Sequence, residues 1–139
     1  MGLVYEEITL KNVYDVEMCD RGLIKKSEVR QITVQALVDT GASTLVITEE
    51  IQKKLGLGIK GKRYATLANS KKDMCKIAGG VEIIWKDRST LVSPMVISGN
   101  GKVLLGAIPL EGMDLIVDPL KQVLVGAHGK EIVTYIMCA

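Results

Sequence analysis

The stretch Ala36-Leu37-Val38-Asp39-Thr40-Gly41-Ala42-Ser43 decides the fold of this chain. Its first three residues are apolar and predict a buried strand, which ends at Asp39 because Asp and Gly are unfavourable in strands. A carboxylate at the end of a buried strand is costly unless it is hydrogen-bonded or has a function. Two interpretations follow. Asp39 either binds local backbone amides in a polar turn, or it is a catalytic carboxylate held by the amides of that turn.

The composition predicts a single folded domain over residues 1–139, with an aliphatic core. Hydrophobic residues make up 47% of the chain, while Phe is absent and Trp occurs once. The three cysteines are odd in number and form no C-x-x-C pair, which is typical of a reducing compartment and predicts a cytoplasmic location. The net charge is only +2, and no basic run is interleaved with aromatic residues, so no nucleic-acid partner is expected.

The sequence predicts neither a metal nor another cofactor. His128 is the only histidine, and it lies in the turn-like stretch 126–129, so a histidine-based metal site is not expected. The glycines around Lys102 lack the spacing of a phosphate-binding loop. No signal peptide and no apolar run of membrane-spanning length is recognised, so no membrane association is expected.

Alternating apolar residues predict strands on the N-terminal side of the motif. Residues 2–16 are expected to form one or two strands, residues 19–27 a hairpin connection, and residues 28–36 a strand that leads into the motif. After the short apolar run 45–47, a helix is predicted from Thr48 to Leu55. Thr48 is a suitable N-cap, acidic residues follow it, lysines precede the end, and Gly56 can stop the helix.

The rest of the chain is predicted to be mostly strand. A long hairpin is expected over 63–84 with a polar turn at 68–73, then strands at 81–85 and at 90–97, where Pro94 marks a bulge or edge. A strand at 102–106, a short helix or turn at 108–113, a final hairpin at 114–125 and an apolar segment at 130–138 follow. So many short strands with one clear helix predict an all-β fold, a closed or sandwich-like barrel.

The motif and its surroundings resemble the active-site region of aspartic proteases. Residues 37–43 look like the catalytic signature, and Val103-Leu104-Leu105-Gly106 resembles the second landmark of that family, two hydrophobic residues followed by glycine. The order of the elements also fits, over roughly residues 28–125. The best match is to the single-lobe, retropepsin-like group, clan AA, and within it to small prokaryotic cellular members, because the helix after Thr48 is longer than in the compact viral enzymes. This resemblance implies an acid-protease-type closed β-barrel.

The resemblance also implies a homodimer. Aspartic proteolysis needs two carboxylates that share one proton, so that one acts as a base toward water and the other donates to the scissile carbonyl. This chain has no second D-T-G or D-S-G motif. Asp114 and Asp118 lack the following hydroxyl and glycine and are interpreted as turn or strand-end residues. The second carboxylate is therefore expected to be Asp39 of a second copy, across a two-fold axis.

The family pattern implies roles for the other motif residues. Thr40 is expected to form a hydrogen bond across the dimer interface, and Gly41 to allow close approach of the backbone. Ala42 and Ser43 are expected to line the cleft, with Leu67, Ala68 and Asn69 in a flap that closes over an extended peptide or protein substrate. The flap lacks the glycine-rich tip of viral relatives. Leu104, Leu105 and Gly106 are expected to pack behind the catalytic loop.

Three functions are compatible with these patterns. The first is a homodimeric aspartic endopeptidase that activates water between two Asp39 carboxylates. The second is a dimeric module of the same fold that binds extended peptides without cutting them. The third is an unrelated monomeric β-barrel in which Asp39 is structural. The apolar stretch 132–137 is expected to be either an interface strand or an ordinary internal strand.

Overall fold

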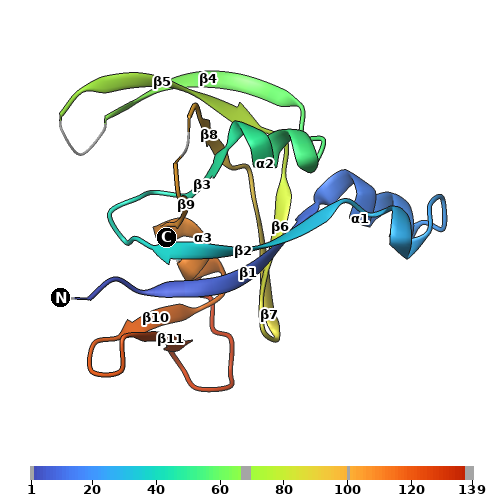
Figure 1. The fold of residues 1–139 in the computed structure, drawn as a ribbon. Helices are drawn as coiled ribbons and strands as arrows, with labels where there is room; N and C mark the ends of the chain where they lie inside the picture. The colour runs from blue at the N-terminus through green and yellow to red at the C-terminus, as the bar shows by residue number, and fades with distance from the viewer. Residues whose placement is uncertain (1, 67–69, 100, 137–139) are drawn as a thin grey trace.

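Strand β2, which carries the motif, lies inside a nine-stranded sheet that curls around the core (Figure 1). The structure is a computed structural model that describes residues 2–66, 70–99 and 101–136. In chain order its elements are β1 (Tyr5–Asn12), α1 (Val13–Asp20), the 3-10 turn η1 (Lys26–Glu28), β2 (Gln31–Val38), β3 (Leu45–Thr48), α2 (Glu49–Lys54), β4 (Ile59–Thr66), β5 (Lys72–Ala78), β6 (Val81–Trp85), β7 (Arg88–Val92), β8 (Met95–Ile97), β9 (Val103–Leu105), α3 (Ala107–Gly112), β10 (Leu115–Asp118) and β11 (Val123–Gly126).

The large sheet has the strand order β4-β5-β8-β3-β9-β2-β1-β6-β7, and β10 pairs separately with β11. The sheet curls into a half-barrel whose pairing runs from β4 to β7, while the β10–β11 hairpin lies below β1 in Figure 1. The prediction of a mostly β fold is confirmed. Helix α3 forms where a short helix or turn was expected, and α1 is a helix in addition to the one clear helix that the sequence predicted. The sheet is curled into a half-barrel with edge strands β4 and β7, whereas the sequence analysis predicted a closed β-barrel.

The centre of the sheet brings together segments that are far apart in sequence. Strand β9 lies parallel to β2, with Leu37 opposite Leu104 and Val38 opposite Leu105. On its other side β9 runs antiparallel to β3, with Leu45 opposite Leu105. The strand before the motif and the strand after it are thus held by the same short strand.

The core is aliphatic, as the composition predicts. Its largest fully buried side chains include Ile8, Leu10, Leu45, Ile47 and Leu105. Burial of such a side chain stabilises the fold by roughly 1.5–3 kcal/mol. The core therefore fixes β1, β2, β3 and β9 relative to one another.

The predicted helix after Thr48 is confirmed as α2. The Thr48 hydroxyl accepts a hydrogen bond from the amide of Ile51 at 3.3 Å, which satisfies one of the free amides at the helix start. Gly56 follows the helix with φ of +64°, a conformation that favours glycine. Within the described ranges, no helix is long and apolar enough to cross a membrane.

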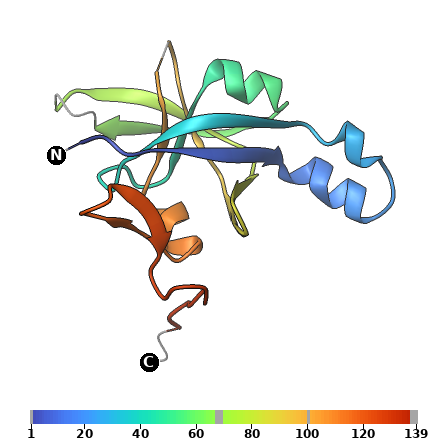
Figure 2. The same cartoon turned by 60° about the horizontal axis from the view of Figure 1, so that its bottom comes forward.

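The sequence-based prediction missed helix α1, because residues 13–16 were expected to continue a strand. Asn12 caps this helix by accepting from the amide of Asp15 at 3.1 Å, and its own side-chain amide donates to the Leu55 carbonyl at 2.7 Å. The connection between β1 and β2 is therefore helical, and Figure 2 shows it projecting from the body of the molecule. The Asn cap followed three residues later by an acid was the signal that could have revealed it.

Two further predictions need correction. The strand expected over 90–97 is interrupted at Pro94, so that β7 pairs with β6 while β8 pairs with β3 and β5. Proline has no amide hydrogen for a ladder, and the chain passes there from one part of the sheet to another. In the C-terminal segment, residues 132–136 form no internal strand, and His128 and Glu131 form only an isolated bridge.

Candidate active site

The Asp39 carboxylate emerges from the end of β2 in a tightly hydrogen-bonded turn. Its Oδ1 atom accepts from the Gly41 amide at 2.9 Å, and its backbone carbonyl accepts from the Ala42 amide at 3.0 Å. The residue is half-buried. Among the described residues, no group donates a hydrogen bond to Oδ2. One oxygen is therefore fixed by the turn, and the other is available to a substrate, a water molecule or a second carboxylate.

Gly41 suits the closeness of this turn. A Cβ atom added at Gly41 would lie 3.1 Å from Oδ1 of Asp39, tighter than ordinary van der Waals contact. Any larger residue would press against the carboxylate. The glycine thus lets the backbone amide reach the acid.

The second motif lies directly behind the turn. The Asp39 amide donates to the Leu105 carbonyl at 3.0 Å, and the amides of Ala107 and Ile108 donate to the carbonyls of Ala42 and Ser43, each at 2.9 Å. A Cβ added at Gly106 would lie 2.4 Å from the Thr44 carbonyl oxygen. The loop is therefore clamped from behind by backbone groups, and only glycine fits at the point of contact.

Two leucine side chains, those of Leu37 and Leu104, lie on the same face of the sheet as the Asp39 carboxylate. Side chains alternate between the faces of a strand, so Leu37 leaves β2 on the same face as Asp39, two residues later. Leu104 is its neighbour on β9, and both leucines are half-buried, whereas Ala36 and Leu105 on the opposite face are buried. The carboxylate thus stands beside partly exposed leucines that could contact an apolar side chain of a ligand.

The β4–β5 hairpin extends toward the same side of the molecule as the loop 39–44, in both Figure 1 and Figure 2. Its strands pair in register from Ile59 opposite Ala78 to Thr66 opposite Lys72. The hairpin predicted over this region is confirmed, although it begins earlier, at Ile59. The flap residues expected to contact substrate, Leu67, Ala68 and Asn69, lie outside the described residues.

A cleft of about 280 Å³ opens beside the loop. Ser43 and Thr44 form one part of its lining, Arg63 and Ile77 of the β4–β5 hairpin another, and Leu91, Val92, Ser93, Met95 and Ile108 the rest. The sequence analysis predicted Ser43 at a cleft but did not single out the other residues. The alternation of faces in β4 was the signal that could have identified Arg63.

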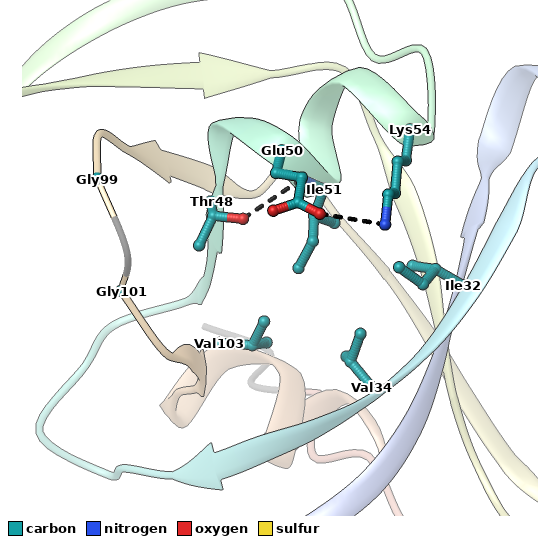
Figure 3. A pocket seen from close by; sticks show the side chains of 9 residues that line it. All are labelled: Ile32, Val34, Thr48, Glu50, Ile51, Lys54, Gly99, Gly101 and Val103. Carbon is teal, nitrogen blue, oxygen red and sulfur yellow. Dashed lines mark hydrogen bonds and ion pairs between the residues drawn. The ribbon is translucent and has the colours of Figure 1, made fainter.

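A second cleft, of about 360 Å³, lies between α2, β2 and the two glycines Gly99 and Gly101 (Figure 3). Ile32, Val34 and Val103 form its apolar part, while Glu50 and Lys54 pair at 3.1 Å above them (Figure 3). None of residues 39–43 or 104–106 lines this cleft. It is therefore separate from the surroundings of Asp39.

The other candidate carboxylates are engaged elsewhere. Asp114 accepts from the amide of Val133 at 3.0 Å and contacts Nδ1 of His128 at 2.7 Å. The Val133 amide, with help from His128, holds the pKa of Asp114 below its usual value. Asp118 accepts from the amides of Lys121 and Leu120, which lower its pKa. Both acids thus occupy turns at the ends of β10, as interpreted from the sequence.

No group of three or more His, Cys, Asp or Glu side chains that could hold a metal ion occurs in the described part of the chain. The Asp39 loop is accordingly built from one acid and backbone amides.

Comparisons with known proteins agree with the resemblance inferred from the motif. The family model described as "Aspartyl protease" matches residues 26–82, which include the Asp39 loop and the β4–β5 hairpin. No curated protein sequence matches this chain at a significant level.

Solved structures share the fold. The retroviral protease-like domain of Ddi1 from Leishmania major is similar with a TM-score of 0.56 and 14% identity, over 90% of this chain and 88% of that one. A retropepsin-like aspartic protease from Rickettsia conorii is similar with a TM-score of 0.53 and 22% identity, over 87% of each chain. The chain therefore has a retropepsin-like fold, and the resemblance stated from the sequence is confirmed.

Proposed function

We propose that residues 1–139 form one aspartic endopeptidase domain, which hydrolyses peptide bonds as a homodimer. The observation that carries this proposal is the Asp39 carboxylate, which is fixed through Oδ1 by the Gly41 amide and receives no hydrogen bond at Oδ2 from any described residue. The match to the aspartyl protease family model over residues 26–82 supports the same class of activity.

The chemistry requires a second acid close to Asp39, and the described residues offer none with a suitable setting. Asp114 is engaged by the Val133 amide and by His128, and Asp118 by the nearby amides of Leu120 and Lys121. A symmetric dimer supplies the missing group as a second Asp39, since a two-fold axis places the same residue on both sides. Thr40, which is exposed in the single chain, then lies at this interface and donates a hydrogen bond across it.

The proposed reaction proceeds through a shared proton. Two carboxylates at short distance cannot both ionise, so one stays protonated and the other charged, and they titrate as a pair. The charged acid takes a proton from water as its oxygen attacks the carbonyl carbon of the peptide. The protonated acid gives its proton to the carbonyl oxygen. The resulting tetrahedral intermediate collapses when the acid that took the proton from water gives it to the amide nitrogen. The C–N bond then breaks, and a hydroxyl of the intermediate returns its proton to the other carboxylate as the carboxylic acid product forms.

The substrate of this reaction is an extended peptide or protein segment. It lies between the loop 39–43 and the β4–β5 hairpin, which would act as the flap. An extended peptide can pair its backbone with strand edges, so that alternate side chains enter pockets. Leu37 and Leu104 then face the side chains nearest the cleaved bond.

The test is cleavage of unstructured peptide libraries between pH 4 and 7, with and without pepstatin, analysed by mass spectrometry. Asp39→Asn should abolish pepstatin-sensitive cleavage while leaving the sedimentation behaviour unchanged. Asp118→Asn is a matched control, because this carboxylate caps a turn away from the loop, and it should retain activity. Binding without cleavage by the wild-type protein would instead indicate the peptide-binding module, and persistent cleavage by Asp39→Asn would overturn the assignment.

A further inference from the structure

The β4–β5 hairpin is far more basic than the rest of the chain. The chain as a whole carries a net charge of +2. The hairpin contains a single acidic residue, Asp73, and a set of lysines and arginine that are all exposed: Lys60, Lys62, Arg63, Lys71, Lys72 and Lys76. Surface charges are usually mixed in sign, because repulsion between like charges costs stability.

The register of β4 and β5 places two like charges opposite each other. Lys62 lies directly opposite Lys76 in the antiparallel register. Like charges at such positions destabilise a strand pair by a few tenths of a kcal/mol or more. Strand pairing therefore does not account for the basic surface of the hairpin.

The two faces of the hairpin present different residues. Lys62 and Lys76 share one face, together with the exposed pair Tyr64 and Met74. Arg63, one residue along, belongs to the opposite face and pairs with Cys75, which is buried. That inner face also contains Ile77, and both Arg63 and Ile77 line the cleft beside Ser43 and Thr44.

Arg63 is the only lysine or arginine that lines this cleft within the described residues. It forms no hydrogen bond or ion pair with any described residue. Asp73 lies on the same face of the hairpin, but its carboxylate accepts from the Met74 amide at 2.8 Å instead. No acceptor within the described parts of the chain thus engages the guanidinium group, which lies next to an apolar wall that includes Ile77, Met95 and Ile108.

We propose that Arg63 is a specificity-determining residue that selects substrates with an aspartate or glutamate near the cleaved bond. This inference rests on the proposed peptidase function. The apolar wall takes the aliphatic part of a substrate side chain, and the guanidinium group binds a carboxylate, whose planar geometry it matches. The outer lysines of the hairpin add a longer-range attraction for acidic segments, which weakens as salt is raised.

The cleft does not hold the residue at the cleaved bond itself. The hydrogen bond from the Ala42 amide to the Asp39 carbonyl closes a turn in which the Cα atoms of these two residues lie within about 7 Å, and Ser43, which lines the cleft, is one residue farther along. An extended substrate advances about 3.3 Å per residue. The acidic residue is therefore expected about two to four positions from the cleaved bond.

The test compares peptides that differ only by Glu, Gln or Lys at one position, scanned from four residues before to four residues after the cleaved bond. The wild-type protein should prefer Glu over Gln at one such position by about fivefold to tenfold in kcat/KM, as expected for a partly exposed charge pair. Arg63→Gln should remove this preference, and Arg63→Glu should reverse it toward Lys. Lys62→Gln is the matched control, since Lys62 occupies the outer face of the same strand, and it should keep the positional preference.

Failure of this inference is distinguishable from failure of the proposed function. If the wild-type protein cleaves but Arg63→Glu retains the preference for Glu, Arg63 does not select substrates. If the wild-type protein cleaves nothing, the same peptides are titrated against it by fluorescence anisotropy. Preferential binding of the Glu peptide that Arg63→Glu reverses would then support the role of Arg63 without catalysis. Equal binding of all three peptides would overturn it.

Discussion

The backbone amide of Asp39 donates a hydrogen bond to the backbone carbonyl of Leu105 at 3.0 Å. This single bond joins the two motifs that the sequence separates by more than sixty positions. It belongs to the parallel pairing of β2 with β9, in which Val38 lies opposite Leu105. The position of the carboxylate is therefore set by β9 as much as by its own strand.

Gly106→Ala should destabilise the protein, because a Cβ there would lie 2.4 Å from the Thr44 carbonyl and 2.5 Å from the Ala42 carbonyl. Backbone atoms cannot move aside as a flexible side chain can, so a loss of about 1–3 kcal/mol in the free energy of unfolding is expected. Urea denaturation measures it. Gly61→Ala is the control, since nothing lies within 4 Å of a Cβ at that position. Equal stability of the two variants would contradict the clamped loop.

Thr40→Val should weaken the proposed dimer while the single chain stays folded. Thr40 is exposed in the single chain, so its hydroxyl is not needed for folding. Two symmetry-related hydrogen bonds of about 1 kcal/mol each would be lost, which corresponds to roughly a thirtyfold rise in the dimer dissociation constant. Sedimentation equilibrium over a concentration series measures this, and Thr40→Ser should restore association. A wild-type chain that remains monomeric throughout would argue against the homodimer.

Asp15→Asn should destabilise the fold at neutral pH. The buried Asp15 carboxylate accepts from Nε of Arg30 at 2.8 Å, from its Nη2 at 2.9 Å and from its backbone amide at 3.0 Å. A loss of about 1–2 kcal/mol is expected, because Arg30 itself is half-exposed. Glu17→Gln on the same helix is the control. Its ion pair with Arg21 is exposed on both sides, and its loss should cost less than about 0.5 kcal/mol.

The Asp15 contribution should also depend on pH in a defined direction. The hydrogen bond from the Arg30 side chain lowers the pKa of Asp15 relative to an unfolded value of about 3.9. The stabilisation is therefore complete above about pH 4 to 5 and is lost as the pH falls through the lower folded-state value. Denaturation curves at several pH values should show a smaller acid dependence in Asp15→Asn than in the wild-type protein.

Acidification should release the segment around Val133. The Asp114 carboxylate holds the Val133 amide, and this bond together with His128 lowers the pKa of Asp114. The hydrogen bond between the Asp114 carboxylate and the Val133 amide is fully present above about pH 3.9, the ordinary pKa of an aspartate. It is lost as the pH falls through the lowered pKa of Asp114 in the folded protein. Amide hydrogen exchange at Val133 should accelerate there, after correction for the intrinsic pH dependence. Asp114→Asn should show fast exchange already at neutral pH, unlike Asp118→Asn.

Local sequence patterns were sufficient to predict those elements that are stabilised by interactions between residues close together in the sequence. Thr48, the acids after it and Gly56 predicted α2 correctly, because capping and end charges act within one helical turn. The final hairpin was also found from alternation and turn residues. Helix α1 was missed although the Asn12 cap is a local signal, and the pairing of Asp15 with Arg30 across the connection adds a long-range contact. That contact is not visible as a periodic pattern.

The candidate site divides in the same way. Asp39, Thr40 and Gly41 were recognisable as a unit, since the turn is formed by residues two or three positions apart. Arg63 was not recognised as a candidate binding residue, because its role depends on its position in the cleft beside Ser43, which only the folded structure reveals. The break at Pro94, which moves β8 into the middle of the sheet, was interpreted only as a bulge or an edge.

The sequence by itself determined that a carboxylate, a hydroxyl and a glycine follow a buried strand, because residue type fixes both strand propensity and turn geometry. The tertiary structure alone decided what surrounds that carboxylate. It placed β9 between β2 and β3, pressed Gly106 against the loop, and turned Arg63 rather than Lys62 toward the cleft. These outcomes depend on which strands pair and in which register, since a shift of one residue would exchange the two faces of every strand.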